Sequence, residues 1–396
     1  MPKIHIKDVY IMKRVVNLLK LLAKKSHFLF GPRACGKTYL IESDLKDRAE
    51  VINLLDSDQY LTLIANPSNL RAIIDASKHP IIVIDEIQRI PELLNEVHLY
   101  LENRSKKPKK FLLTGSSARK LKNADANLLG GRVRKAELFP FCSKELKDSN
   151  VYDLDKILSF GTLPLVYLGN EPFENLRDYV DVYLNEEISR ECNVRNLPNF
   201  SRFLTVAALS SGELINYTKI ANDSQNHPNT VREYFQILID TLLGFTLEPW
   251  GLSKKRKAIQ TAKAYLFDVG VTRAICNLSV LQPNTNEYGK AFEQFIALEL
   301  RAYKSYFGKT DQIYFWRTSD QIEVDFIIGD HTAIEVKASK KVSTRDHKGL
   351  LKLKEEKIIK NFLLVSLDPI PMRFETGIEH IHIDEFQKRL WEGELF

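Results

Sequence analysis

The residues with the clearest chemical signature lie near the N-terminus, where three apolar residues (Phe28, Leu29 and Phe30) lead into Gly31-Pro-Arg-Ala-Cys-Gly-Lys-Thr38. This stretch fits the P-loop pattern, in which two glycines precede a lysine and a threonine. The glycines let the backbone curl so that its N–H groups face phosphate oxygens. Lys37 can then reach the β- and γ-phosphates of ATP, and the Thr38 hydroxyl can hold Mg²⁺. A chance glycine-rich turn is the alternative, but the strand-like run before the loop and the helical pattern after it favour a nucleotide site.

A second stretch supports a nucleotide site. Pro80-Ile-Ile-Val-Ile-Asp85-Glu86 is a run of β-branched residues that ends in two carboxylates. Such a run predicts a parallel strand buried on both faces. Because ligands of open α/β sheets bind at the carboxyl ends of strands, we expect Asp85 to face the P-loop and to hold Mg²⁺ through water. Glu86 would polarise the attacking water. A solvated strand end would explain one acid but not the pairing with an upstream P-loop.

The C-terminal third carries a different set of candidate residues. Glu293 lies on an amphipathic helical stretch from Tyr288 to Arg301, and Asp325 and Glu335 lie on two strand-like runs separated by Gly329-Asp330-His331. In a hairpin the two acids can point to one end, and Glu335 and Lys337 share a face. This set could hold one or two Mg²⁺ or Mn²⁺ ions and activate water for phosphodiester cleavage, with Lys337 as a catalytic residue. An ordinary charged hairpin is the alternative.

The elements that must position these residues follow from periodicity. Helices are predicted over Val9 to Lys24, Thr38 to Asp47 and Leu70 to Ser77, and strands over Glu50 to Leu55 and Lys109 to Ser116. Strands that alternate with helices predict a parallel, doubly wound sheet.

The middle of the chain has a helical pattern followed by the pattern of a winged helix. Asp178 to Glu187 is typical of a helical lid or linker. Helices are predicted over Phe200 to Ser210, Asn216 to Ala221 and Asn229 to Asp240, the last in the position of a recognition helix with Asn229 as its N-cap. Leu247 to Phe267 would form the wing. Winged helices also act as protein-interaction modules, so DNA contact here is one of two interpretations.

Composition limits the class of protein. The 396 residues allow two to four domains, and the net charge of +6, from 57 basic and 51 acidic residues, does not by itself indicate nucleic acid. Basic runs at 104–110 and at 254–257 are either solvated loops or phosphate contacts. The four scattered cysteines indicate a reducing compartment. With no signal-peptide pattern and no apolar run of about 18 residues, we expect a soluble, cytoplasmic protein without membrane contact.

These motifs together resemble the bacterial and archaeal AAA-type P-loop ATPases that carry a winged helix and a C-terminal PD-(D/E)XK nuclease-like domain. The resemblance covers nearly the whole chain, and it rests on Gly31 to Thr38, Asp85-Glu-Ile-Gln88, Leu113-Thr-Gly-Ser-Ser117, Gly131-Arg132, Tyr265-Leu-Phe-Asp268, Phe292-Glu293, Glu323-Val-Asp325 and Glu335-Val-Lys337. Val324 stands where the proline of the nuclease motif would be, a substitution that removes no ligand.

The resemblance implies roles for further residues. Ser116 would be a sensor of the γ-phosphate, with a β-turn as the alternative. Arg132 would be an arginine finger that acts on a neighbouring subunit, with Arg134 or a local salt bridge as alternatives. The predicted ATP-binding residues are therefore Gly31, Pro32, Arg33, Ala34, Cys35, Gly36, Lys37, Thr38, Tyr39, Asp85 and Ser116. The predicted metal ligands are Thr38, Asp85, Glu293, Asp325 and Glu335, and the predicted catalytic residues are Glu86, Arg132 and Lys337.

The sequence thus predicts four segments: a P-loop ATPase core at 1–140, a helical lid or linker at 141–199, a winged helix at 200–280 and a small α/β nuclease-like domain at 281–396. The expected function is a Mg²⁺-dependent ATPase acting on DNA, with branched DNA such as Holliday junctions as a candidate substrate. It would work as a homo-oligomer, with a hexameric ring as a candidate assembly. The alternative is a nucleotide-dependent switch or scaffold whose nuclease-like domain is inactive and binds a protein or nucleic-acid partner. Cleavage of DNA is left open by the sequence.

Overall fold

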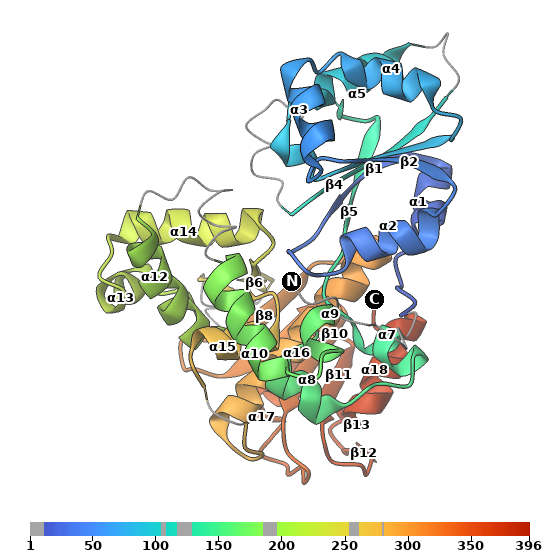
Figure 1. The fold of residues 1–396 in the computed structure, drawn as a ribbon. Coiled ribbons are helices and arrows are strands. Elements are labelled where there is room, and N and C mark those ends of the chain that lie inside the picture. Colours follow the sequence, from blue (N-terminus) through green and yellow to red (C-terminus); the bar gives the residue numbers. More distant parts are fainter. Residues whose placement is uncertain (1–11, 104–107, 117–128, 185–195, 253–260, 279–280) are drawn as a thin grey trace.

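The structure, a computed structural model, describes residues 12–103, 108–116, 129–184, 196–252, 261–278 and 281–396. Two α/β bodies make up the fold (Figure 1), one built on the N-terminal sheet and one on a sheet from the C-terminal half. Of the two basic runs, residues 104–107 and all of 254–257 lie outside the described residues.

The N-terminal sheet has five described strands in the order β2-β3-β4-β1-β5, and every pairing is parallel. The strands are β1 (Ser26–Phe30), β2 (Ala49–Asn53), β3 (Ile81–Asp85), β4 (Lys110–Gly115) and β5 (Val133–Glu137). This confirms the predicted parallel sheet. The fifth strand was not predicted, because its sequence Val-Arg-Lys-Ala-Glu is mostly charged, as an edge strand allows.

Helices cover both faces of this sheet, since alternate strand residues enter two different cores. Phe28, Phe30, Ile82 and Ile84 pack with α3 (Ser57–Ala65), α4 (Asn69–Ala76) and α5 (Leu93–Glu102). Leu29 and Val83 pack with α1 (Leu18–Lys24) and α2 (Lys37–Leu45). The sheet is therefore doubly wound.

The helix predicted from Val9 to Lys24 is shorter than expected. Helix α1 begins only at Leu18, because the Asn17 side chain caps it by accepting from the backbone N–H of Lys20. Residues before Met12 lie outside the described ranges. The extended stretch that precedes α1 instead places Arg14 in the interior.

Helices dominate the middle of the chain. After α7 (Ser143–Asp148), α8 (Leu154–Phe160) and α9 (Pro164–Tyr167), the expected lid segment is divided into α10 (Pro172–Asp178) and a π-helical turn, η3 (Tyr179–Leu184). Three helices follow near the predicted positions: α12 (Leu197–Leu209), α13 (Tyr217–Asp223) and α14 (Pro228–Asp240). The predicted N-cap of α14 was wrong: His227 caps the helix by accepting from the N–H of Asn229, with Pro228 at the first helical position.

The second sheet has eight described strands in the order β12-β13-β11-β10-β9-β8-β6-β7. They are β6 (Gly244–Pro249), β7 (Lys263–Leu266), β8 (Ile313–Arg317), β9 (Glu323–Ile328), β10 (Thr332–Lys337), β11 (Asn361–Ser366), β12 (Met372–Arg373) and β13 (Glu379–His382). Strands β9 and β10 form the predicted antiparallel hairpin. The helices of this half are α15 (Val269–Ile275), α16 (Asn286–Tyr306), α17 (Lys348–Lys354) and α18 (Ile383–Glu392).

The predicted wing is a real hairpin, but it belongs to the C-terminal sheet. Strands β6 and β7 pair antiparallel, and β6 pairs parallel with β8 at Glu248 and Pro249. One hydrophobic core accordingly collects residues from all four predicted segments, among them Met12, Phe141, Tyr265 and Phe292. Among the described residues, no helix is both long enough and apolar enough to cross a membrane.

Candidate functional site

The P-loop connects the end of β1 to the start of α2, as its sequence requires. Gly31 is indispensable there, because a Cβ would lie 2.3 Å from the carbonyl oxygen of Leu138. Gly36 has φ +94°, a conformation that favours glycine, and it directly precedes α2. The loop therefore ends on a helix N-terminus, where backbone N–H groups and the helix dipole favour an anion.

Lys37 is buried and is held by its own loop. Its ammonium donates to the carbonyl oxygen of Gly31 at 2.7 Å and to that of Pro32 at 3.2 Å. Both partners are neutral. A phosphate group could replace them without separating an ion pair.

Asp85 lies where the sequence placed it, at the carboxyl end of β3 and beside the P-loop helix. It is 2% exposed, and its Oδ2 accepts from the Thr38 hydroxyl at 3.3 Å. Its Oδ1 accepts from the hydroxyl of Thr114, at the end of β4. Hydroxyl and carboxylate oxygens are the ligands that Mg²⁺ prefers, so this donor set fits that ion.

Glu86 has a left-handed backbone (φ +61°), which is uncommon for a residue other than glycine and turns the chain directly after the strand. Its Oε2 accepts from Gln88 Nε2 at 2.6 Å, and the same nitrogen donates to Ser116 Oγ at 3.3 Å. The structure thus brings Glu86, Gln88 and Ser116 into one polar chain. Thr114 and Gln88 were missed as contributing residues, although both lie within the quoted motifs.

The remaining P-loop residues form the walls of the loop. Cys35 is fully buried, and Ala34 has φ +63°. The carbonyl oxygen of Arg33 accepts from the Tyr179 hydroxyl at 3.3 Å, which ties the loop to η3. Tyr39 lies in the first turn of α2 and is partly exposed.

Arg14 is a contact that sequence reasoning missed. Its guanidinium donates to Glu145 Oε1 at 2.9 Å, to the carbonyl oxygen of Cys35 at 2.8 Å and to that of Phe139 at 2.6 Å. Burial disfavours the charged form, but the attraction of Glu145 outweighs it and raises the pKa of Arg14. One buried side chain therefore joins the P-loop to α7. The sequence around Arg14 does not indicate that this side chain links the P-loop to α7.

Arg132, the predicted arginine finger, forms a local ion pair. Its Nη2 lies 2.8 Å from Glu102 Oε1, and both side chains are partly exposed. This is one of the alternatives that the sequence left open. Arg134 lies on β5 opposite His27 of β1.

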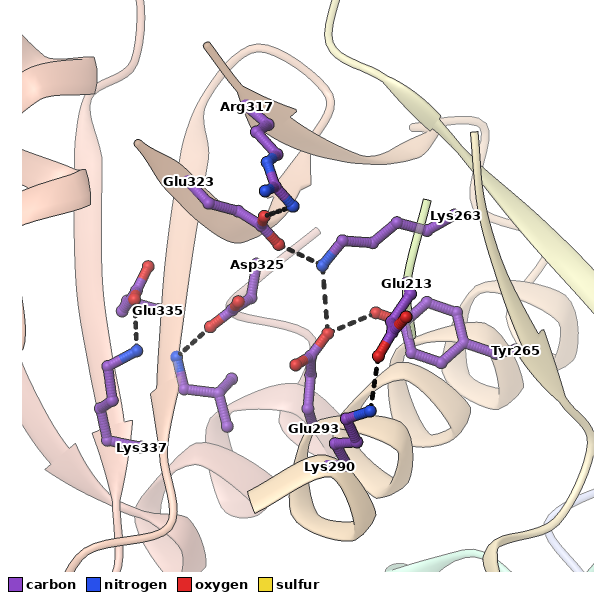
Figure 2. Close-up of polar contacts among 11 residues, drawn as sticks. Glu213, Lys263, Tyr265, Lys290, Glu293, Arg317, Glu323, Asp325, Glu335 and Lys337 are labelled. Atoms are coloured by element: carbon purple, nitrogen blue, oxygen red, sulfur yellow. Dashed lines mark hydrogen bonds and ion pairs between the residues drawn. The ribbon is translucent and has the colours of Figure 1, made fainter. Parts of the chain in front are cut away.

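The C-terminal candidates converge around an acidic cluster, which we define as Glu293, Glu323, Asp325 and Glu335 (Figure 2). Helix α16 supplies the first, β9 the next two and β10 the last. Asp325 Oδ2 accepts from the N–H of Val336 at 2.7 Å, and Lys337 donates to Glu335 Oε1 at 2.6 Å. The predicted set Glu293, Asp325, Glu335 and Lys337 is thus brought together by the fold.

The cluster also contains cations and donors that the sequence did not reveal. Lys263 of β7 points between two acids (Figure 2): its Nζ lies 3.3 Å from Glu293 Oε1 and pairs with Glu323. Arg317 Nη1 lies 3.0 Å from Glu323 Oε2, and the Tyr265 hydroxyl donates to Glu293 Oε1 at 2.6 Å. The sequence around Lys263 does not predict these ion pairs, because Glu293 and Glu323 are 30 and 60 residues away in the sequence.

Burial and mutual repulsion dominate the electrostatics of the cluster. Burial, with the charge of Glu293, raises the pKa of Asp325 to about 7. Burial and Asp325 raise the pKa of Glu335 well above its ordinary value. Burial works against the charge of Lys263, but Glu293, Glu323 and Asp325 outweigh it and raise its pKa, so this lysine stays charged.

Within the described ranges, no group of three or more histidine, cysteine or carboxylate side chains is arranged to hold a metal ion. In the cluster, the ammonium of Lys263 occupies the space between Glu293 and Glu323. In this arrangement the cluster does not fit a divalent cation. A cleft of about 580 Å³ opens beside it, lined by residues that include Lys219, Lys263, Lys290, Glu293, Arg317 and Glu323.

Comparisons with protein families divide the chain in a similar way. Residues 23–147 match a family described as an AAA domain. Residues 151–282 and 288–386 match two families described as domains of unknown function, DUF8612 and DUF4143. The similarity to an AAA domain thus falls on the N-terminal body, which carries the P-loop. The other two descriptions give no activity, so the winged helix and the nuclease-like domain stay predictions.

Among characterised folds, the chain is similar to the RuvB Holliday junction branch migration motor of Thermotoga maritima, at 16% identity over 61% of this chain and 93% of that one, with a TM-score of 0.30. It is also similar to the Aeropyrum pernix ORC1 protein in complex with DNA, at 14% identity over 66% and 90%, with a TM-score of 0.25.

Two relatives are more similar in sequence. Uncharacterised proteins of Mycobacterium bovis and Mycobacterium tuberculosis are each 27% identical over 308 residues, which cover 76% of this chain and 66% of each relative. The chain therefore spans slightly less than two thirds of the length of these proteins.

Proposed function

We propose that this chain is a Mg²⁺-dependent ATPase that acts on DNA as a homo-oligomer. The observation that carries the proposal is the hydrogen bond from the Thr38 hydroxyl to Asp85 Oδ2, which are 3.3 Å apart beside the P-loop. Glu86 is the next residue in the chain. The match of residues 23–147 to an AAA domain supports it.

The residues of the site have distinct proposed roles. The P-loop backbone and Lys37 bind the phosphates, once Lys37 exchanges the carbonyls of Gly31 and Pro32 for phosphate oxygens. The Thr38 hydroxyl, and the Asp85 carboxylate through water, would hold Mg²⁺, which would supply positive charge to the phosphates. Glu86 orients and polarises the attacking water, and Gln88 positions Glu86 through the 2.6 Å hydrogen bond.

Arg132 is proposed to complete the site of a neighbouring subunit. The Glu102 pair is partly exposed, so it costs little to break when a nucleotide offers a stronger partner. Mixing Arg132→Ala with Lys37→Ala subunits should then restore hydrolysis that neither has alone, because each supplies what the other lacks. A monomeric mass in ATP together with no complementation would contradict the oligomer.

The nucleic-acid part of the proposal rests on the winged-helix pattern and on the basic run at 254–257 between β6 and β7. Replacing the four basic residues by alanine should weaken DNA binding across sequences and flatten its salt dependence, because phosphate contacts release counterions. Unchanged affinity would move the DNA site elsewhere.

A second function is favoured by one observation, the ion pairs of Lys263 in the acidic cluster. In that alternative the chain is a nucleotide switch whose C-terminal half binds a partner without cutting it.

ATP hydrolysis and strand cleavage should be measured with single-stranded, duplex and four-way-junction DNA, with Lys37→Ala as control. DNA-stimulated hydrolysis that Lys37→Ala abolishes supports the first proposal, and absence of hydrolysis on every substrate overturns it. Nicking that Lys337→Met abolishes would assign Lys337 a place beside the scissile phosphate.

A further inference from the structure

Lys263 holds an unusual position for a lysine. Its side chain is only 3% exposed, and its Nζ lies 5.4 Å from the centre of the Phe315 ring. The ammonium is therefore buried among carboxylates rather than extended into the neighbouring cleft, although Lys263 lines that cleft. Burying a charge in this way is costly unless opposite charges surround it, and here they do.

The acids outnumber the cations only slightly. The cluster has four carboxylates, and among the described residues the cationic side chains that pair with them are Lys263, Arg317 and Lys337. Crowded acids otherwise need an external cation or must take up protons. Lys263 relieves this need at Glu293 and Glu323, which are joined through its single ammonium group.

One buried oxygen of the cluster is nevertheless unsatisfied. Glu335 is 7% exposed, and its Oε2 has no hydrogen-bond partner among the described residues. A native structure seldom leaves such an atom without a partner. The cluster therefore has capacity for a further cationic ligand that its present arrangement does not use.

We propose that Lys263 is a built-in counter-ion that keeps divalent cations out of the acidic cluster, and that a cation binds there only when β7 withdraws this lysine. A divalent cation bridging Glu293 and Asp325 would face the Lys263 ammonium at short range, and the two positive charges would repel. The carboxylates can therefore bind either the Lys263 ammonium or a divalent cation, but not both at once. This inference rests on the proposed role of the C-terminal half on DNA, and it makes the β6–β7 hairpin the regulator of that site.

The contacts that such a movement must break are well defined. Strand β7 has four residues at the edge of the sheet, and it pairs with β6 and through a bridge with Leu214. The N–H of Gly212 donates to the carbonyl oxygen of Ala264 at 2.8 Å, and Tyr265 and Leu266 are buried. Strand β6 in turn pairs with β8 at only two register positions. Lys263 is too buried to rotate away alone, so its release requires the strand to shift.

The test measures Mn²⁺ binding to the full chain without nucleotide. The electron paramagnetic resonance signal of free Mn²⁺ reports how much of the ion stays unbound. Lys263→Met removes the ammonium and keeps the aliphatic stem, and Lys263→Arg keeps the charge. Lys290→Met is the matched control, because Lys290 lines the same cleft but pairs with Glu213. Lys263→Met should bind one Mn²⁺ at least about tenfold more tightly than the wild type. Adding Asp325→Asn should abolish the gain, and the other two variants should behave as wild type.

Two results overturn the proposal: wild-type chain that already binds Mn²⁺ through Asp325 as tightly as Lys263→Met, or folded Lys263→Met that binds none. A second measurement needs no variant. Amine-reactive labelling read by mass spectrometry should leave Lys263 protected while Lys290 reacts, and equal labelling contradicts the occlusion. ATP hydrolysis is assayed on the same samples, so loss of the proposed ATPase is distinguished from failure of this inference.

Discussion

The nucleotide site and the acidic cluster both contain a lysine and carboxylates, but these side chains are partnered in opposite ways. Lys37 donates to two backbone carbonyls, and Asp85 accepts from two threonine hydroxyls. In the cluster, Lys263 and Arg317 pair directly with Glu323. Neutral partners can be exchanged for a ligand without separating charges, whereas an ion pair must first be broken. The difference explains why we expect one site to accept its ligand directly and the other to need a movement first.

The largest expected effect concerns Arg14, which joins the P-loop to α7 through Glu145. Arg14→Met would leave the buried Glu145 carboxylate without its cation, which typically costs about 3–5 kcal/mol. Urea unfolding would measure the loss. The exposed pair of Lys144 and Asp148 provides the control, since Lys144→Met should cost under about 1 kcal/mol. If both variants cost the same small amount, Arg14 does not hold the P-loop to α7.

A smaller effect is expected within the nucleotide site. Glu86→Gln should lower kcat by about 10²-fold or more, equivalent to about 2.7 kcal/mol, while nucleotide binding is retained, because only water activation is lost. Phosphate release and nucleotide affinity should be measured together. Glu92→Gln, an exposed acid at the start of α5, is the matched control. Hydrolysis at the wild-type rate would show that Glu86 is not the base.

The smallest effect tests the electrostatics of the cluster through pH. The folded pKa of Asp325 is about 7, against about 3.9 for an unperturbed aspartate. Between these values the unfolded chain releases a proton that the folded chain keeps, so this group lowers stability as pH rises. Asp325→Asn should therefore gain stability relative to the wild type from pH 5 to pH 8, by about 2.5 kcal/mol.

Thermal melting across this pH range checks the prediction, with the exposed turn residue Asp330 mutated to Asn as control. A difference in melting temperature that stays constant, or that reverses, would contradict the assigned direction.

The sequence predicted the nucleotide body well because its signals are local. The strand that ends at Phe30 and the strand that ends at Asp85 are short apolar runs beside chemical motifs, and both occur as β1 and β3. Strand β5 was missed because its charged residues lie at a sheet edge, where alternation is weak. The P-loop could be identified from the fixed spacing of its glycines and threonine alone, without information on tertiary contacts.

The acidic cluster was predicted only in part. Glu293, Asp325, Glu335 and Lys337 lie on elements with clear periodicity, so their convergence could be inferred. Lys263 reaches them because β6 joins β8 and thereby merges the wing hairpin with the C-terminal sheet. That pairing depends on tertiary packing rather than on any local pattern. Arg14 was missed for the same reason, since its partners Cys35, Phe139 and Glu145 come together only in the fold.

The measurement that tests the contrast most directly is the number of Mn²⁺ ions bound per wild-type chain with and without a non-hydrolysable ATP analogue. We predict one ion in the presence of nucleotide, lost in Asp85→Asn and kept in Asp325→Asn, and no tight ion in its absence. This result would show a nucleotide site ready for its metal and a C-terminal cluster closed by Lys263. A tightly bound ion without nucleotide that depends on Asp325, or no ion with nucleotide, would contradict the account.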